Sequence, residues 1–582
     1  STSGSRHWRR LILRSYMKSL CSDTSSTLSA ASDQFVSPER WCVNQKDLRY
    51  LRREVHNAVQ LEQIVPTNAD PFEVADEVYG PSIYSVVEQF IKPNVGITSW
   101  ALKRHPAGLK CDIFITHAWM EGIYEFIDKV LNSWPHDAQN AWCCMLANPQ
   151  NSDIGSLIAR PQDSPFAVAL HAAKYVLVVP NRHGSIYTRL WCAYEAFIAY
   201  ESQKLIRTAT RPQRLRAARA ACLAVFVALG SVAAALFFIA RSEEEPCWTP
   251  NSSTPPYFWT NCVFLAFGTL AVFSSGLTAQ LSTYCCIFLT TRSGLRGCGN
   301  FGEAYFHTAL IVYFVISEVD RIHNSVVGEE SAALRNGFTG SIVDATCSHV
   351  TDECRIRAEI DDFQLTQVDR TIQVLLESGM STQSLRLAAD AGVRVRDAAH
   401  MDLAPLTFGF TLLPLGPLVI FTGQGFHDYL TLLVVLEWLL ATGLFFFLLR
   451  SSADGRVFTA RAFPKLFLVG CFALSPFWLF QLRVGSIDMY TTDHYTLAMI
   501  LNLDLCWAIT ICLSVVKLHR IAAVPLCGRA LAQLLVAKLE WSHPGRDTDW
   551  RVDGSPKSTS GCSSVPSSRE LYDMLPSHEL SS

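Results

Sequence analysis

The sequence predicts an α/β domain with a doubly wound parallel sheet, joined to an α-helical multi-pass transmembrane region. Two observations predict the two parts. Between residues 111 and 205, short apolar runs typical of buried parallel strands alternate with stretches of helical periodicity. Elsewhere, several apolar stretches are long enough to cross a bilayer as helices.

Composition agrees with a chain that is partly in a membrane. The 582 residues suffice for two or more domains, and 49% are hydrophobic against 17% charged, which predicts long apolar runs. The net charge of −3 gives no global basic field, so we expect no nucleic-acid partner. The 19 cysteines show no paired C-x-x-C spacing, so we predict no metal site and no disulfide framework. Because the chain begins with Ser, we expect residues to be missing before it.

The first 110 residues are expected to form two segments. Residues 1–43 are basic and Ser-rich, a composition typical of disorder. Residues 44–110 predict a helical lead-in, with a polar helix from Asn44 to Ile64 and one or two short helices between Pro71 and Phe90, ending at Pro93. We expect this lead-in to pack on the domain that follows it.

Residues 111–205 carry the strand–helix alternation. Strands are predicted at 111–118, 141–148 and 174–181, helices at 121–134 and 165–173, and a polar loop at 149–164. Ligands of such sheets bind beyond the carboxyl ends of the strands. His117, Asn148 and Asn181 should therefore lie at the ligand edge, together with the start of the helix that follows the third strand.

That helix contains the best single candidate residue, Glu195. The stretch Ile186–Tyr200 is apolar or aromatic at nearly every position, and Glu195 is its one carboxylate. A carboxylate in a buried helix is usually paired, protonated or chemically active. The helical pattern alone leaves two structural alternatives open, a place on the polar stripe of the helix or an ion pair with Arg189.

The motifs around Glu195 resemble those of a known family. A D-I-F-I-T-H strand (residues 112–117) opens the domain, and V-V-P-N (178–181) leads into S-I-Y-T-R-L-W-C-A-Y-E (185–195). This pattern resembles the Toll/interleukin-1 receptor (TIR) domain, which has a flavodoxin-like fold, and is most similar to its plant and protist versions. The W-C-x-x-E match falls on Trp191, Cys192 and Glu195.

The resemblance implies an activity and a site. Glu195 would be the catalytic residue that cleaves NAD⁺ into nicotinamide and ADP-ribose products, with NAD⁺ as substrate and no required cofactor. His117, Trp119, Asn181, Arg189 and Trp191 are the candidates for binding the dinucleotide. Each has a structural alternative, because Trp191 could equally pack in the core, Arg189 could pair with an acid, and His117 could be a satisfied structural histidine.

The second part of the TIR-like domain is expected much later in the chain, at 341–401. Residues 341–379 resemble the strand and helix that close such domains, with a strand near Ile342. The intervening residues would then be an insertion, made of a transmembrane hairpin (206–300) and a connecting segment (301–340) with a short apolar helix at 304–316.

Charge placement orients the hairpin. The uncharged stretch 220–240 is preceded by basic residues from Lys204 to Arg219, which predicts a cytosolic TIR-like domain. A loop with Glu243–Glu245 and a glycosylation sequon at Asn251 would lie on the other side, and a span at 262–281 would return the chain.

Four further spans are predicted within 402–520, at 405–422, 429–449, 466–482 and 495–516. Basic clusters then place both termini in the cytosol, with six spans in all; the plasma membrane and endomembranes remain equally open. A cytosolic amphipathic helix (521–542) and a disordered tail (543–582) follow. Glu437 and Asp504 lie inside predicted spans, where an acid is a functional hypothesis.

Three functions follow from these patterns. The first is a multi-pass membrane protein with a cytosolic TIR-like signalling domain that hydrolyses NAD⁺. The second is a non-catalytic TIR-like interaction module that acts by self-association. The third is a channel or transporter that the domain regulates, with Glu437 and Asp504 on the path. All three have the lipid bilayer as a partner.

Overall fold

The structure is a computed structural model that describes residues 36–212, 299–395 apart from 348, 428–450, 461–470 and 489–536, with a few single positions besides. The predicted spans at 220–240, 262–281 and 405–422, most of the one at 466–482, and the Asn251 sequon lie outside the described residues. So do most of the N-terminal segment and the C-terminal tail.

A mixed six-stranded sheet is the centre of an α/β domain, with strands in the order β1-β3-β2-β4-β5-β6. The strands are β1 (Val43–Asn44), β2 (Ile113–Thr116), β3 (Asn140–Cys143), β4 (Tyr175–Val178), β5 (Leu205–Thr208) and β6 (Met380–Ser381). The four inner strands pair in parallel, and both edge strands pair antiparallel. From β2 the chain adds β3 on one side and then β4 and β5 on the other, so the winding reverses beside β2.

Helices pack on both faces of this sheet, which is why the residues of β2 are all buried. On one face, Ile113 and Ile115 join a core with α2 (Gln45–Gln60) and α6 (Ile123–Asn132). On the other face, Phe114 stacks on Trp142, and Phe166 of α9 (Pro165–Ala172) contacts Trp142 edge-on. The helix with Glu195, α10 (Leu190–Glu201), packs beside α9.

The lead-in segment forms part of the domain core. α2 begins with a capping box in which Asn44 and Asp47 bond each other's backbone, and it ends close to the predicted boundary. The helices expected between Pro71 and Phe90 start only at α3 (Ile83–Val86), which continues through a π-helical turn into α4 (Lys92–Val95). Pro93 does not end the helix there, because it lies just after the π-helical turn, and the helix continues to Val95. α5 (Trp100–Arg104) completes the segment.

Two predictions for the sheet were wrong in detail. The strand expected at 141–148 ends at Cys143 and gives way to α7 (Cys144–Ala147), because an apolar run alone does not separate a strand from a buried helical turn. β5 lies where the transmembrane hairpin was expected to begin. Its four residues, with alternating burial, are too short to stand out from the basic flank that follows.

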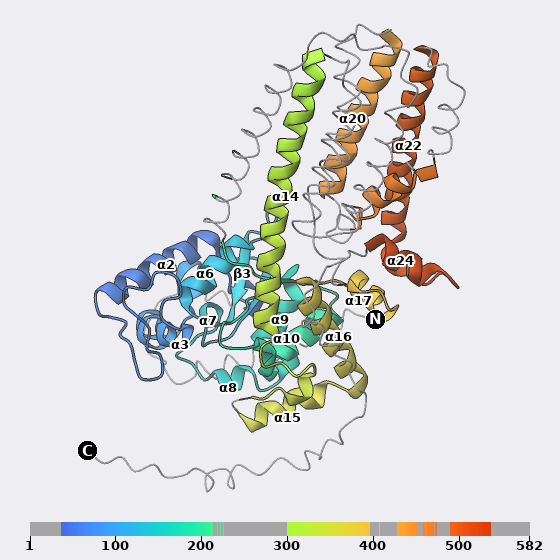
Figure 1. Cartoon of the computed structure of the whole chain (residues 1–582). Helices are drawn as coiled ribbons and strands as arrows, with labels where there is room; N and C mark the ends of the chain where they lie inside the picture. The colour runs from blue at the N-terminus through green and yellow to red at the C-terminus, as the bar shows by residue number, and fades with distance from the viewer. Residues whose placement is uncertain are drawn as a thin grey trace, which may run out of the picture. The chain divides into compact units, whose positions relative to one another are not determined.

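The connecting segment 301–340 also differs from its prediction. Instead of a short helix at 304–316, the structure has α14 (Gly299–Arg335), whose 37 residues span about 55 Å. Figure 1 shows its C-terminal half beside α16, and contacts between the two helices agree. The polar residues of that half made it look like a linker in the sequence, whereas in the fold they contact the α/β domain.

Residues 341–395 join the same sheet, but not through the strand expected near Ile342. That residue begins a 3-10 turn (Ile342–Asp344), followed by α15 (Val350–Glu359) and α16 (Asp362–Ser378). The edge strand is β6, which pairs with β5 and is followed by α17 (Gln383–Asp390). α16 ends at Gly379, whose φ of +70° lets the chain turn directly into β6.

Two long helices occupy predicted spans, α20 (Asp428–Arg450) and α22 (Met489–Val516). Ala441 of α20 packs with Leu503 and Trp507 of α22 in one apolar cluster. None of the helices in the described ranges is long and apolar enough to cross a membrane. The helix expected at 521–542 appears as α24 (Gly528–Val536), which packs with α23 (Leu518–Ala522) against α17.

One buried ammonium group links several parts of the α/β domain. Lys129 on α6 is 2% exposed, and its Nζ donates to the carbonyl oxygen of Pro180 at 2.7 Å. It also pairs with Glu125 at 3.0 Å and with Glu330 of α14 at 2.9 Å. The Lys129 side chain therefore connects α6 both to the chain after β4 and to the long helix α14.

We expect Lys129→Met to lower the free energy of unfolding by about 3–5 kcal/mol, because it leaves buried carboxylates without their cation. Denaturant unfolding of the purified chain, followed by tryptophan fluorescence, measures this loss. The matched control is Lys174→Met, since Lys174 also pairs with an acid, Asp137, but its side chain is 64% exposed. That pair should contribute about 1 kcal/mol or less. Equal losses in the two variants would contradict the role given to Lys129.

Candidate functional site

Glu195 lies in the middle of α10, the helix that follows the third parallel strand. Its neighbours include Thr116 at the carboxyl end of β2, together with Cys144 just after β3 and Cys192 one turn earlier in α10. The carboxyl group is thus held at the edge of the sheet where ligands of α/β proteins bind.

The Glu195 side chain is neither on a polar stripe nor in an ion pair. It is 6% exposed, and among the described residues its Oε2 atom has no hydrogen-bond partner and its carboxylate forms no ion pair. Burial raises the pKa of this carboxyl to about 7, although the nearby Thr116 hydroxyl and the Arg189 charge both lower it. Both structural alternatives from the sequence are therefore excluded, and Glu195 is a buried acid without an ion pair among the described residues, whose pKa is raised by burial.

His117 is bonded through both ring nitrogens. Its Nδ1 lies 3.3 Å from the carbonyl oxygen of Ala118, a geometry that assigns the proton to Nδ1. Nε2 then accepts from the Cys144 thiol at 3.2 Å. Burial lowers the pKa of His117 to about 4, so the ring is neutral at physiological pH. Burial likewise raises the pKa of Cys144 to about 12, which makes it a poor nucleophile.

The loop before α10 is held by a strap, the segment 336–346 that follows α14. Ser185 N donates to Asn336 O at 2.7 Å, and farther along Leu190 N donates to Thr346 O at 2.9 Å while Thr346 N donates to Thr188 O at 2.9 Å. The Phe338 ring packs on Tyr187 with centroids 6.0 Å apart. Residues more than 100 positions away in sequence thus fix the start of the Glu195 helix.

The remaining predicted binding residues divide into those at the edge and those in the core. Trp191 stacks on Phe166 and meets Tyr194 edge-on, so its ring is used in packing. Trp119 packs edge-on against Tyr84. Asn181 is 6% exposed and its side chain accepts from His183 N, closing a tight turn. Arg189 is half-buried and immediately precedes α10.

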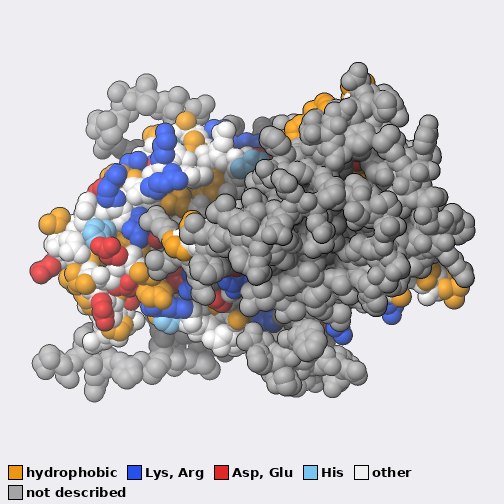
Figure 2. Space-filling view, turned by 45° about the horizontal axis from the view of Figure 1, so that its top comes forward, with side chains coloured by type: hydrophobic (Ala, Val, Ile, Leu, Met, Phe, Trp, Pro, Cys, Tyr) orange, Lys and Arg blue, Asp and Glu red, His pale blue; other side chains and the backbone are white. Residues whose placement is uncertain are grey.

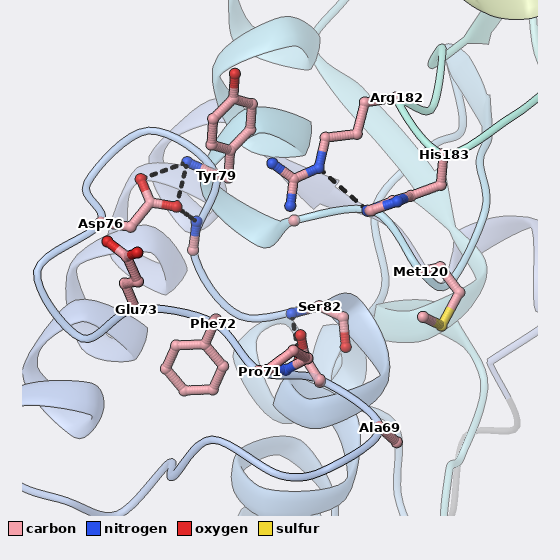
Figure 3. Close-up of a pocket in the computed structure, with 13 residues that line it drawn as sticks. Ala69, Pro71, Phe72, Glu73, Asp76, Tyr79, Ser82, Met120, Arg182 and His183 are labelled. Atoms are coloured by element: carbon pink, nitrogen blue, oxygen red, sulfur yellow. Dashed lines mark hydrogen bonds between the residues drawn. The ribbon is translucent and has the colours of Figure 1, made fainter.

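A pocket with a volume of 610 Å³ lies at the same edge, within the size range of small-molecule sites (Figure 3). Its walls come from the lead-in residues 69–82 and from the loops after β2 and β4. Arg182 stacks over the Tyr79 ring at 4.1 Å, and its Nε donates to His183 Nε2 at 3.1 Å. The carboxylate of Asp76, another lining residue, accepts hydrogen bonds from three backbone N–H groups of its own loop. Glu195 does not line this pocket.

The pocket has one fixed positive charge, Arg182, among three acids, Asp70, Glu73 and Asp76. Arg182 and His183 are exposed, and Arg182 keeps its terminal nitrogens available beside an aromatic ring. Phe72, Pro71 and Met120 supply an apolar wall, and Glu73 supplies an acceptor. Sequence reasoning missed these residues. Arg182 and His183 directly follow the predicted residue Asn181, so the same reasoning could have included them. Nothing in the sequence indicated that residues 69–82 would lie opposite them.

The described residues contain no group of three or more His, Cys, Asp or Glu side chains that could hold a metal ion. On the face of the domain drawn in Figure 2, basic and acidic side chains are interspersed with apolar ones. The chemistry at this edge is therefore that of a buried acid near a mixed-charge pocket. Comparison with protein-family models, with curated proteins and with solved structures found no match to this chain.

We expect Glu195→Gln to change the pH dependence of stability. The pKa of Glu195 rises from 4.5 to about 7 on folding, so its stabilising effect is present below pH 4.5 and is lost as the pH rises to 7. Since the glutamine variant lacks this titration, its stability relative to the parent should rise by about 3 kcal/mol over that interval.

Denaturant unfolding at several pH values between 4 and 8 measures the difference. Glu201→Gln, at the exposed end of the same helix, is the control for the loss of a carboxylate from α10. A difference between Glu195→Gln and the parent that stays constant with pH would contradict the buried state of this acid.

Proposed function

We propose that residues 111–395 contain a TIR-like domain that hydrolyses NAD⁺ to nicotinamide and ADP-ribose products, with Glu195 as the catalytic residue. The observation that carries the proposal is the state of Glu195, which is buried and unpaired at the ligand edge of a parallel sheet. The strand order supports it too, because the winding reverses beside β2, whose last residue neighbours Glu195.

A lone carboxylate suits this reaction. As the bond between nicotinamide and ribose breaks, positive charge develops on the sugar, and a fixed carboxylate in a poorly solvated site stabilises it. The leaving nicotinamide is neutral and needs no metal, and water completes the hydrolysis. Because the ionised form is required, activity should increase as the pH rises through the Glu195 pKa of about 7.

The pocket at Arg182 offers a place for the rest of the dinucleotide. Arg182 and His183 would bind its phosphates, and Phe72 and Met120 would contact a ring. Glu195 is buried in this conformation, so substrate reaches it only when the loop before α10 opens. The strap 336–346 holds that loop closed.

The membrane part of the proposal is a multi-pass anchor that keeps the domain and both termini in the cytosol. The uncharged sequence 220–240 supports it, as do the basic residues before it. Through this anchor the domain would signal from a membrane surface. If the domain is not catalytic, it would act by self-association.

We expect the purified full chain to release nicotinamide from NAD⁺, and Glu195→Ala to reduce the rate by roughly 100-fold or more. Chromatography of nicotinamide against time measures it. Glu201→Gln, on the same helix, should act like the parent. Arg182→Ala should raise KM with little change in kcat, whereas Arg53→Ala, an arginine near Tyr50 outside the pocket, should change neither.

Turnover by Glu195→Ala as fast as by the parent would refute the catalytic assignment. A parent chain that releases no nicotinamide but self-associates in sedimentation would favour the interaction module instead.

A second candidate function, ion or proton transport, is favoured by one observation. Glu437 of α20 is 8% exposed and its Oε2 has no hydrogen-bond partner among the described residues, while the charge of Asp504 on α22 reaches it. The sequence only placed these acids in separate spans. Two neighbouring acids between apolar helices are costly unless they bind a proton or a cation.

If this is their role, the purified chain in liposomes should pass protons or monovalent cations, and Glu437→Gln or Asp504→Asn should abolish the flux. Fluorescent pH and ion indicators inside the liposomes measure it, with Glu201→Gln as the control. Equal flux in the parent and both variants would remove the hypothesis.

A further inference from the structure

Lys129 has three partners at its ammonium group, and a further carboxylate interacts with it electrostatically. An ammonium group has three donors. Here Nζ donates to Pro180 O and forms ion pairs with Glu125 and Glu330. Glu121, the residue before the turn into α6, is 0% exposed, and neither of its carboxylate oxygens has a hydrogen-bond partner in the described residues. The charges of Lys129 and Glu330 both influence the pKa of Glu121.

This arrangement puts three acids around one base inside the domain. Three ionised carboxylates and one ammonium would leave two uncompensated negative charges in a buried site, which is very costly. Glu121 receives no donated hydrogen bond, so it is the acid that must carry a proton in this conformation. Once ionised, it would need a donor from Lys129, and one of the present partners would have to leave.

Glu330 is the partner that can leave. Glu125 is one helical turn from Lys129 on α6 and moves with it, and Pro180 belongs to the chain that follows β4. Glu330, in contrast, is on α14, a separate helix. We propose that Glu121 and Glu330 compete for Lys129, so that α14 docks on α6 while Glu121 is protonated and is released when Glu121 ionises.

The charged groups around the site favour docking at lower pH. Burial raises the pKa of Glu121 well above its ordinary value, with Glu125 and Glu330 adding to the effect and Lys129 opposing it. The Cys143 thiol on β3 interacts electrostatically with Glu121, and Arg211 does so with Glu330. Burial raises the pKa of Glu330 too, while the charge of Lys129 opposes this and favours the ionised form in the docked ion pair. Docking therefore takes up a proton at Glu121 and weakens as the pH rises.

Release of α14 has a defined consequence for the candidate site. α14 ends at Arg335, and the strap that holds the loop before α10 begins at the next residue. The exchange at Lys129 would loosen the strap and the loop together. This inference goes beyond the proposed function and does not rest on NAD⁺ chemistry.

Hydrogen exchange measured by mass spectrometry on the purified full chain in detergent tests the exchange of partners. Exchange times are scaled for the intrinsic pH effect, and the amides of 320–346 are followed from pH 5 to 9. In the parent, their protection should fall with pH, with a slope approaching tenfold per pH unit for one linked proton. Glu121→Gln, which mimics the protonated acid, should keep high protection throughout.

Glu329→Gln is the matched control, because Glu329 is the neighbour of Glu330 on α14 but pairs with Arg211 at the surface. It should keep the pH dependence of the parent. Protection of β2 and β4 in the same spectra shows that each variant is folded, and Glu121→Met replaces Glu121→Gln if the glutamine variant is not. Protection at 320–346 that is independent of pH in the parent, or a slope unchanged in the Glu121 variant, would overturn the proposal.

Discussion

The fold depends on one buried ammonium group, that of Lys129. A charge at 2% exposure is tolerated only while its partners stay in place, and those partners come from different parts of the chain. Through them α6 is joined to the chain after β4 and to α14. Each of these segments leads to the candidate site, since one continues into the loop before α10 and the other into the strap. The geometry around Glu195 is therefore tied to an interaction on another helix.

The sequence predicted the centre of the sheet well, because burial on both faces produces continuous apolar runs. β2, β4, α6 and α9 lie within their predicted ranges. Prediction failed where the same sequence pattern is compatible with two different structures. The apolar run after Asn140 contains a strand and then a helical turn, and the basic sequence after Leu205 hid a strand. The polar half of α14 looked like a linker. Polar residues are found both in exposed linkers and in helices that contact a buried charged site, so the sequence does not distinguish the two.

The candidate site was predictable to the extent that its residues are at strand ends or in the following helix. Glu195, His117, Asn181 and Arg189 were proposed in this way. What the sequence could not supply was their partners. The strap at 336–346 comes from beyond a long insertion, and the Tyr79 ring under Arg182 comes from a lead-in without a recognisable motif. The unpaired state of Glu195 also required the structure, because absence of a partner is a property of the whole neighbourhood.

The strap has a consequence for how such a chain could diverge in evolution. Its bonds to the loop before α10 join backbone groups of Asn336 and Thr346 to those of Ser185, Thr188 and Leu190. Backbone bonds do not specify side chains, so most substitutions in the strap would be tolerated. The length of the strap is more constrained. Adding or deleting one residue between Asn336 and Thr346 would shift one set of bonds out of register. In related chains, selection here should conserve residue number more strictly than residue identity.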